Sequence, residues 1–193
     1  MPRMVRKTFL SAALVSAFTL LALGCSSVGR VSLNPTVNLA VAPATLADQA
    51  AVYIPTLQQK LMHSQTLDVI GRVEVELGPA FSKCAQESFQ LFFSQVMMLG
   101  PSETTSLPWR IDLRTDSFRI NPDLGADLQI WCKVMHSGKI VLDQAFKGHV
   151  DGPAQEFRQL GTARKVIQQS SESAFQQAFV ELQKTLREKT AAK

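Results

Sequence analysis

The sequence predicts an α+β fold, a two-layer sandwich with a mostly antiparallel sheet and two helices packed on one face. Several segments alternate apolar and polar residues with the period of a strand. Two longer segments place their apolar residues on one helical face. Turn-forming residues separate neighbouring segments. Elements with one apolar face bury it only against another such face, which predicts two packed layers.

The first 24 residues have the plan of a secretory signal peptide. A basic start precedes an apolar run from Phe9 to Leu23, and Gly24-Cys25 follows. The run is shorter than the ~20 apolar residues that a membrane-spanning helix needs. A cleaved signal is therefore favoured over a retained anchor, and an ordinary secretory signal with a chance cysteine is the other alternative.

The Gly24-Cys25 pair resembles the lipobox of bacterial lipoproteins, although Ala22 and Leu23 depart from the usual Leu and small residue. The resemblance implies that residues 1–24 are removed and that Cys25 is acylated as the first mature residue. Several acyl chains together hold a protein stably at a membrane. Cys25 is thus the expected lipidation site and membrane lipid its first partner.

Ser26 stands where lipoproteins retained in the inner membrane usually have Asp. The resemblance then implies sorting to the outer membrane, with the lipid-anchored protein facing the periplasm. Residues 25–35 read as the lipidated N-terminus and a tether, because polar residues and Gly dominate and Pro35 ends the segment. Residues 36–189 form one periplasmic domain, and residues 190–193 a disordered tail.

Net charge argues against a nucleic-acid partner. The formal charge of +4 includes three basic residues and no acid within 1–24, which leaves about +1 for the mature chain. Nucleic-acid binding needs a clustered basic face. The cations between Lys184 and Lys193 fit better as partners of a helix C-terminus than as a binding patch.

Cys84 and Cys132 remain once Cys25 is assigned to the lipid. An even pair in an oxidising compartment favours a disulfide, and both lie on faces predicted to point inward. Two buried free thiols that behave as small hydrophobes are the alternative.

The first half of the domain alternates between clear and ambiguous segments. A strand is expected at residues 37–41, and a short helix or an irregular crossing at residues 44–66. Residues 70–77 alternate as a half-buried strand. A helix should begin at Gly78-Pro79 and end at Gly100-Pro101, since Pro suits the first turn and Gly the end.

The second half predicts an antiparallel meander and a long helix. The first strand begins at Trp109 and changes phase near residues 115–117, which indicates a β-bulge. Residues 121–123 form a turn, and Ser137-Gly138 suits a tight hairpin between the second and third strands. A long amphipathic helix should then run from about Gln155 to Lys189.

Catalytic and metal motifs were not found. The chain has no Gly-x-Ser-x-Gly elbow and no phosphate-binding glycine loop, and its three histidines lie far apart without metal-ligand spacing. Asp112 and Asp116 alternate with Arg110 and Arg114 on one strand face, which favours ion pairs over a catalytic dyad. We therefore expect no enzyme, no metal and no cofactor.

Three aromatic residues, Trp109, Phe118 and Trp131, are candidates for a ligand surface. Trp131 is the strongest, because strand alternation places it on the face opposite Cys132 and away from the helices. It is the candidate partner or ligand contact. The alternative is packing against residues 44–62.

The order of elements resembles YajG-type outer-membrane lipoproteins and, more loosely, accessory lipoproteins of envelope transport and secretion machines. Pro35-Thr36-Val37, the helix after Gly78-Pro79, the strand 126–130, the Gly138 hairpin and the long C-terminal helix carry the resemblance. It implies a non-enzymatic accessory or scaffold subunit with envelope proteins as partners. Self-association is a further option, since exposed sheet edges can pair.

Two alternatives to the scaffold function remain. The domain could carry or sense a small apolar or glycan ligand in a cleft between sheet and helices. A cell-wall hydrolase is the weaker option, because no convergent acid, base or metal group is visible in the sequence.

Overall fold

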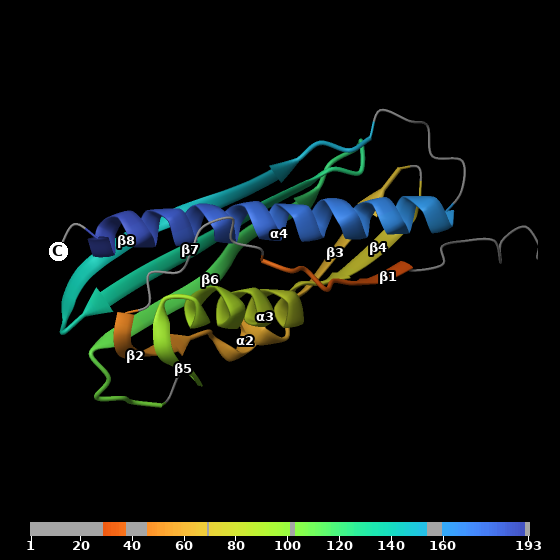
Figure 1. Cartoon of the computed structure of the whole chain (residues 1–193). Coiled ribbons are helices and arrows are strands. Elements are labelled where there is room, and N and C mark those ends of the chain that lie inside the picture. The colour runs from red at the N-terminus through yellow and green to blue at the C-terminus, as the bar shows by residue number, and fades with distance from the viewer. Residues whose placement is uncertain (1–28, 38–45, 69, 101–102, 154–159, 192–193) are drawn as a thin grey trace, which may run out of the picture.

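The computed structural model describes residues 29–37, 46–68, 70–100, 103–153 and 160–191. They form an α+β fold in which α3 and α4 lie together on one face of a long sheet (Figure 1). The elements in chain order are β1 Gly29–Ser32, β2 Leu46–Tyr53, α2 Thr56–Gln59, β3 Met62–Leu67, β4 Gly71–Glu76, α3 Leu77–Gln90, β5 Phe93–Leu99, β6 Trp109–Ile120, β7 Ala126–His136, β8 Lys139–Val150 and α4 Leu160–Ala191. The predicted fold class is confirmed.

The strands form two sheets where the sequence predicted one. The larger has the order β5-β2-β6-β7-β8 and the smaller the order β1-β4-β3. Strand β2 runs parallel to both β5 and β6, and β1 runs parallel to β4. The remaining pairs are antiparallel, so the large sheet is mixed.

The antiparallel meander β6-β7-β8 is confirmed in detail. Its first register shift lies between Thr115 and Ser117, at the predicted bulge. Ser137 and Gly138 both adopt positive φ, at 49° and 80°, in the two-residue loop between His136 and Lys139. Positive φ at both central positions defines the type I′ turn, whose twist matches that of the strands it joins.

Two glutamine side chains continue the pairing of β6 where β2 ends. Gln58 Oε1 accepts the backbone N–H of Thr115 at 3.0 Å. Gln65 accepts the N–H of Ile120 at 3.0 Å and donates to the carbonyl of the same residue at 2.7 Å. Buried or partly buried backbone groups need such partners. Gln65 thereby joins the small sheet to the large one.

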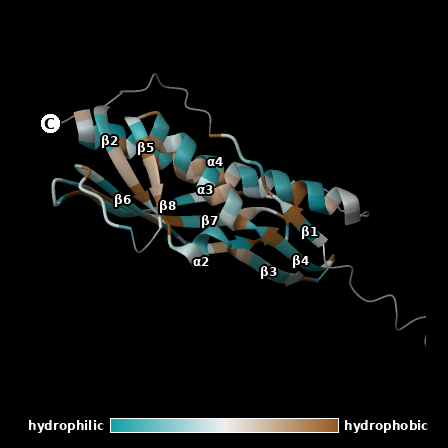
Figure 2. Cartoon of the chain, turned by 90° about the horizontal axis from the view of Figure 1, so that it is seen from below, coloured by the Kyte–Doolittle hydropathy of each residue, from teal (hydrophilic) through white to brown (hydrophobic). Residues whose placement is uncertain are grey.

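The core lies between the large sheet and the helices. Phe81 of α3 and Phe179 of α4 pack at 5.9 Å between ring centroids, and both are fully buried. Figure 2 shows hydrophobic colour along the neighbouring strands β2 and β5. The predicted apolar face of the last helix is buried, with Val166 partly so; its fully buried members are Ile167, Ala174, Phe175, Ala178, Phe179, Leu182 and Leu186.

The region 44–100 departs most from the sequence prediction. Residues 46–53, within the segment expected to be a short helix or a crossing, are the central strand β2, and the short helix is α2. Ala50, Ala51 and Val52 are all fully buried, so the second half of β2 is covered on both faces and has no alternation to detect. The predicted helix 78–100 ends at Gln90, because residues 93–99 pair with β2 as strand β5.

The domain ends also differ from the prediction. Residues 29–32, assigned to the tether, form strand β1 on the small sheet. Val37 lies in no regular element, and the rest of the predicted strand 37–41 lies outside the described residues. The last helix continues to Ala191, so part of the expected tail 190–193 is helical.

Candidate functional site

Cys84 and Cys132 are buried free thiols on α3 and β7, so the expected disulfide is absent from the structure. Burial raises the pKa of the Cys84 thiol to about 12, with a smaller contribution from Glu87. Burial likewise raises the pKa of the Cys132 thiol. A thiol reacts as its thiolate, so both cysteines act as packing groups and not as nucleophiles. Cys25 lies outside the described residues.

The three histidines are separate in space as well as in sequence. His63 bonds Gln65 at 3.0 Å and meets Phe118 edge to face, while His136 stacks on Trp109 at 4.3 Å. Trp109 and Phe118 are 3% and 8% exposed, so neither forms the ligand surface proposed for them. No group of three or more His, Cys, Asp or Glu among the described residues is arranged to hold a metal ion.

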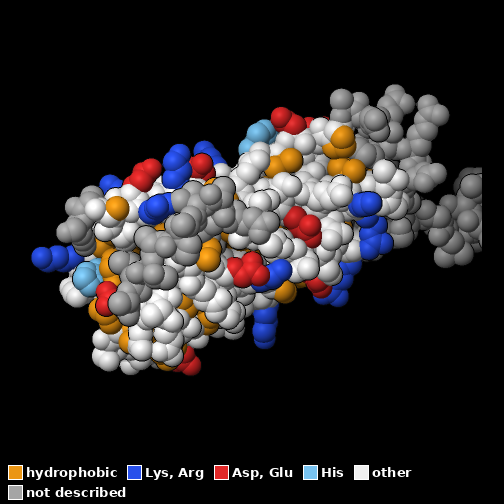
Figure 3. Space-filling view, in the orientation of Figure 1, with side chains coloured by type: hydrophobic (Ala, Val, Ile, Leu, Met, Phe, Trp, Pro, Cys, Tyr) orange, Lys and Arg blue, Asp and Glu red, His pale blue; other side chains and the backbone are white. Residues whose placement is uncertain are grey.

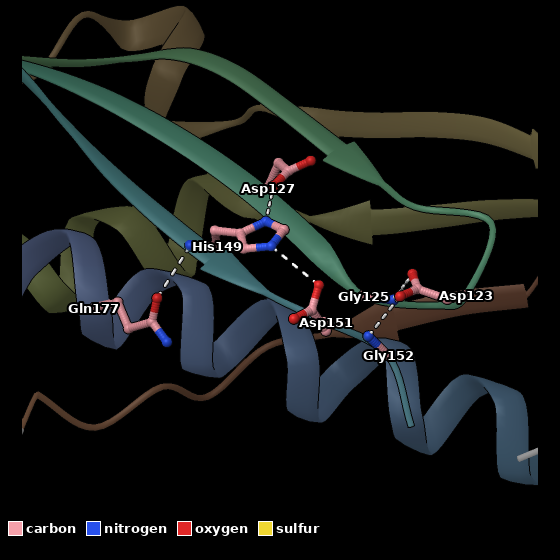
Figure 4. A network of polar contacts seen from close by, with 7 residues as sticks. All are labelled: Asp123, Gly125, Asp127, His149, Asp151, Gly152 and Gln177. Atoms are coloured by element: carbon pink, nitrogen blue, oxygen red, sulfur yellow. Dashed lines mark hydrogen bonds and ion pairs between the residues drawn. The ribbon is translucent and has the colours of Figure 1, made fainter. Parts of the chain in front are cut away.

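His149 takes part in a polar cluster that the sequence did not predict. Its Nδ1 lies 2.5 Å from Asp127 Oδ1 and its Nε2 lies 3.1 Å from Asp151 Oδ1 (Figure 4). The hydrogen bond that the His149 imidazole donates to the Asp127 carboxylate raises the pKa of His149 and lowers the pKa of Asp127. The His149 side chain is 60% exposed to solvent.

Asp123 closes the adjacent turn. Its carboxylate accepts the backbone N–H groups of Gly125 and Gly152, both at 2.9 Å, and these bonds lower the pKa of Asp123. Figure 4 shows the contacts of Asp123 next to those of His149, where β7 begins and β8 ends. Asp123, Asp127, His149 and Asp151 each bond another member of the cluster or a backbone N–H. These four residues, called the clasp at His149 below, therefore link the start of β7 to the end of β8.

The face of the large sheet opposite α3 and α4, called the open face below, carries the predicted charged row of β6. Arg110 Nε lies 3.0 Å from Asp112 Oδ1, and Arg114 Nε lies 2.9 Å from Asp116 Oδ1. The predicted same-face ion pairs are therefore confirmed. All four side chains are a quarter to a half exposed, so each pair contributes at most about 1 kcal/mol to stability.

Each of these arginines also stacks on an aromatic ring. The guanidinium carbon of Arg110 lies 4.3 Å from the ring centroid of Tyr53, and that of Arg114 lies 4.3 Å from the centroid of Trp131. Trp131 is the cross-strand partner of Arg114 and is half-buried on the open face, as alternation predicted. The arginine–aromatic cluster comprises Tyr53, Arg110, Asp112, Arg114, Asp116 and Trp131.

A hollow of about 250 Å³ lies within this cluster. Ile54 and Pro55 form one wall, so the segment expected as the packing partner of Trp131 does border it. The remaining lining is Tyr53, Arg110, Asp112, Leu113, Arg114 and Trp131. Small-molecule sites usually enclose ≈ 300–1,000 Å³. The hollow therefore suits a side chain or a single sugar ring better than a drug-sized ligand.

The sequence identified Trp131 and the charged row but not their combination with Tyr53. Tyr53 belongs to β2, which pairs with β6 so that Tyr53 lies beside Asp112. The paired residues 53 and 112 are almost 60 positions apart in the sequence, and no local turn motif predicts that they pair.

None of the helices in the described part of the chain is long and apolar enough to cross a membrane.

No family model matches the sequence, and no curated protein matches it. The structure is similar to that of protein XCC0632 from Xanthomonas campestris, family-model DUF330, with a TM-score of 0.52 and 13% identity over 84% of this chain and 96% of that chain. A PelC dodecamer from Paraburkholderia phytofirmans matches with a TM-score of 0.34 and 14% identity over 72% of this chain and 94% of that chain.

At 13% identity the likeness to XCC0632 extends to the fold alone, since unrelated functions share folds. The PelC superposition is too loose to extend even that far. The YajG-type resemblance rests on the order of elements and stays a prediction.

Proposed function

We propose that the chain is a non-enzymatic accessory or scaffold subunit of a bacterial envelope assembly, anchored by acylated Cys25 in the outer membrane and facing the periplasm. The arginine–aromatic cluster is the surface through which it binds its partner. The observation that carries the proposal is this half-buried cluster on a sheet face opposite the helices. The two arginines and Trp131 are at least partly exposed while Tyr53 is buried, and this combination of Arg, Tyr and Trp is typical of protein interfaces.

The cluster is suited to binding because its side chains are already held in place. Stacking and ion pairing fix each guanidinium, so little conformational entropy remains to be lost on association. Arginine in such a fixed geometry recognises carboxylates of a partner bidentately. A non-enzymatic function is part of the proposal, since the acids around the hollow are paired with arginines in the same strand.

The proposed lipid anchor lies close in sequence to the folded domain. Strand β1 begins at Gly29, only four residues after Cys25, so acylation would hold the folded domain close to the membrane. A first experiment replaces Cys25 with Ala and follows membrane fractionation and fatty-acid labelling in cells. We expect both to be lost. Retention of label or of membrane association would contradict the anchor.

A second experiment identifies the partner. The native protein is chemically cross-linked in intact cells, extracted from membranes and analysed by mass spectrometry, together with Trp131→Ala and with Lys139→Ala as a matched exposed control. We expect a defined set of envelope proteins that Trp131→Ala loses and the control keeps. Recovery of the protein alone would favour the second candidate function.

That second candidate is a carrier or sensor of a glycan fragment, and the hollow beside Trp131 favours it. Sugars stack on aromatic rings and bond to charged side chains, both of which line the hollow. A monosaccharide-sized ligand found in the purified native protein by mass spectrometry would support this function.

The partner could also be a second copy of this chain, bound through the edge of the large sheet. Strand β5 is an edge of the large sheet, with Met97 and Met98 40% and 37% exposed. Exposed edges with apolar side chains favour strand pairing between molecules. Sedimentation of the detergent-solubilised protein at several concentrations tests this, and a concentration-independent monomer would exclude it.

A further inference from the structure

A groove of about 390 Å³ separates β1 from the first turns of α4. Its lining includes Arg30 and Ser32 from β1, and Arg164, Lys165 and Gln168 from α4. No acidic residue belongs to this lining. Figure 1 shows β1 and the first turns of α4 side by side, at the opposite end of the helix from the C-terminus. Figure 3 shows Lys and Arg side chains over this end and others over the opposite end of the molecule.

The groove has a defined geometry. The Arg164 guanidinium donates to the backbone carbonyl of Arg30, and the Arg164 side chain packs where Gly29 has no Cβ. Arg164 is therefore held along β1 instead of extending freely from the helix. A cation held in this way loses little entropy when it binds an anion.

The acids nearest the groove compensate only part of its charge. Glu76 of β4 pairs with Arg30 at 2.6 Å. Glu172 of α4 accepts the side-chain amide of Gln168 at 3.0 Å. Within the described residues no ion pair engages Arg164 or Lys165, and both are exposed. Two cations thus remain available to an anionic ligand.

The closeness of the groove to Cys25 in the sequence indicates that its ligand is part of the membrane surface. Gly29 is four residues from Cys25, and an extended chain spans at most about 3.6 Å per residue, or roughly 14 Å in all. With Cys25 acylated, the groove therefore lies close to the plane of lipid headgroups. An anionic membrane surface attracts basic residues within about a Debye length, ~8 Å at physiological ionic strength.

We propose that the groove between β1 and α4 binds the phosphate of anionic phospholipid headgroups through Arg164 and Lys165, and so fixes the orientation of the domain on its membrane. This inference rests on the proposed function, because acylation at Cys25 places the groove at the surface. With the first turns of α4 at the membrane, the other end of the helix is held out toward the periplasm.

The test uses the mature chain 25–193 with Cys25→Ser, so that binding to headgroups is measured without the acyl anchor. Sedimentation with phosphatidylcholine vesicles is compared with and without phosphatidylglycerol. We expect binding only to the anionic vesicles. Each basic residue near such a surface contributes roughly fivefold to the partition coefficient, so Arg164→Gln with Lys165→Gln should lower it by about tenfold or more.

Lys184→Gln with Lys189→Gln is the matched control, since it removes the same charge from exposed positions at the other end of α4. Residue 184 lies 20 residues beyond residue 164, roughly 30 Å along the helix, which exceeds the Debye length several-fold. We expect a change of less than about twofold. Circular dichroism of both double variants checks that α4 still forms.

Equal binding to vesicles without phosphatidylglycerol would overturn the inference, and so would equal losses in the two double variants. Failure of the proposed anchor is distinguishable from either result. It would appear as absent fatty-acid labelling of wild-type Cys25 in cells, whatever the headgroup binding of the Cys25→Ser chain.

Discussion

On the covered face of β6, β7 and β8, alternate side chains such as Ile111, Ile130 and Cys132 are apolar and fully buried. On the open face, the residues between them are charged or aromatic and partly exposed, as at Arg114 and Trp131. The same strands thus build two surfaces. Burial of apolar area stabilises the first, whereas stacking and ion pairs organise the second.

The comparison teaches where function can be sought. Side chains on the covered face are constrained by packing against α3 and α4, and a change of one methyl group is felt there. Side chains on the open face contribute little to stability, so their arrangement is free to serve binding. Four variants or conditions sharpen or break this contrast, in order of decreasing effect.

The largest effect is expected from Gly148→Ala on the covered face of β8. A Cβ at Gly148 would lie 1.8 Å from the carbonyl oxygen of Ala174, a backbone atom of α4. The helix must shift to accept it, and we expect a loss of about 3 kcal/mol in unfolding free energy. Denaturant titration measures it.

Ala145→Val is the matched control, because Ala145 lies on the same strand and faces the open side beside Trp131. A β-branched residue suits a strand surface, so we expect a change within about 0.5 kcal/mol. Equal costs for the two variants would break the contrast between the faces.

The sequence predicted the meander well because local signals specify it. The alternation along β6, the phase change at residues 115–117 and the Ser137-Gly138 turn each depend on neighbours in sequence. The charged row of the open face followed from the same alternation, and so did the outward placement of Trp131.

The clasp at His149 escaped prediction for a geometric reason. A two-residue turn that pairs His136 with Lys139 would place His149 opposite Ala126 if the register were regular. A second register shift, between Val134 and Met135, moves the partner of His149 to Asp127. One bulge without a sequence signal therefore decides which side chains meet.

Strands β2 and β5 escaped prediction because they depend on tertiary pairing. The residues of β2 include good helix formers, and the apolar spacing in residues 92–99 also fits a helix. Their parallel pairing with each other, and of β2 with β6, joins distant segments and overrides these local preferences. Because the sequence did not predict β2, it did not predict that Tyr53 belongs to the arginine–aromatic cluster.

A smaller effect on stability is expected from Trp131→Ala on the open face. It removes the stacking with Arg114, which contributes about 1 kcal/mol at a partly exposed site. Partner binding should be lost although the protein remains folded. A stability loss as large as that of Gly148→Ala would show that Trp131 is a core residue and not a binding residue.

A still smaller effect is expected from pH through His149 and Asp127. The raised pKa of His149 stabilises the fold below its ordinary value of 6.5 and ceases to do so as pH rises through the folded value. The lowered pKa of Asp127 stabilises the fold above 3.8 and ceases to do so as pH falls through its folded value. Stabilisation is therefore greatest between about pH 4 and 6.5.

The measurement is the difference in Tm between the wild-type protein and His149→Gln across pH. We expect this difference to be larger at pH 5 than at pH 8, and Asp127→Asn to reduce the pH dependence to the smaller part that Asp151 contributes. A difference that grows toward alkaline pH would contradict the assigned ion pair.

The smallest effect concerns the thiols. With Cys25 replaced by Ser, an aromatic disulfide reagent should leave Cys84 and Cys132 unmodified in the folded protein and modify both after unfolding, because burial raises the pKa of each. Rapid labelling of the folded protein would show that the covered face is accessible. Absence of labelling after unfolding without reductant would show a disulfide.

The central claim, that the open face binds an envelope partner, is tested most directly by photo-crosslinking in living cells. A photoreactive amino acid is placed at Ala145 on the open face or at Glu181, an exposed position on α4. We predict a defined envelope protein cross-linked from Ala145 and not from Glu181. The same products from both positions, or products from Glu181 alone, would contradict the claim.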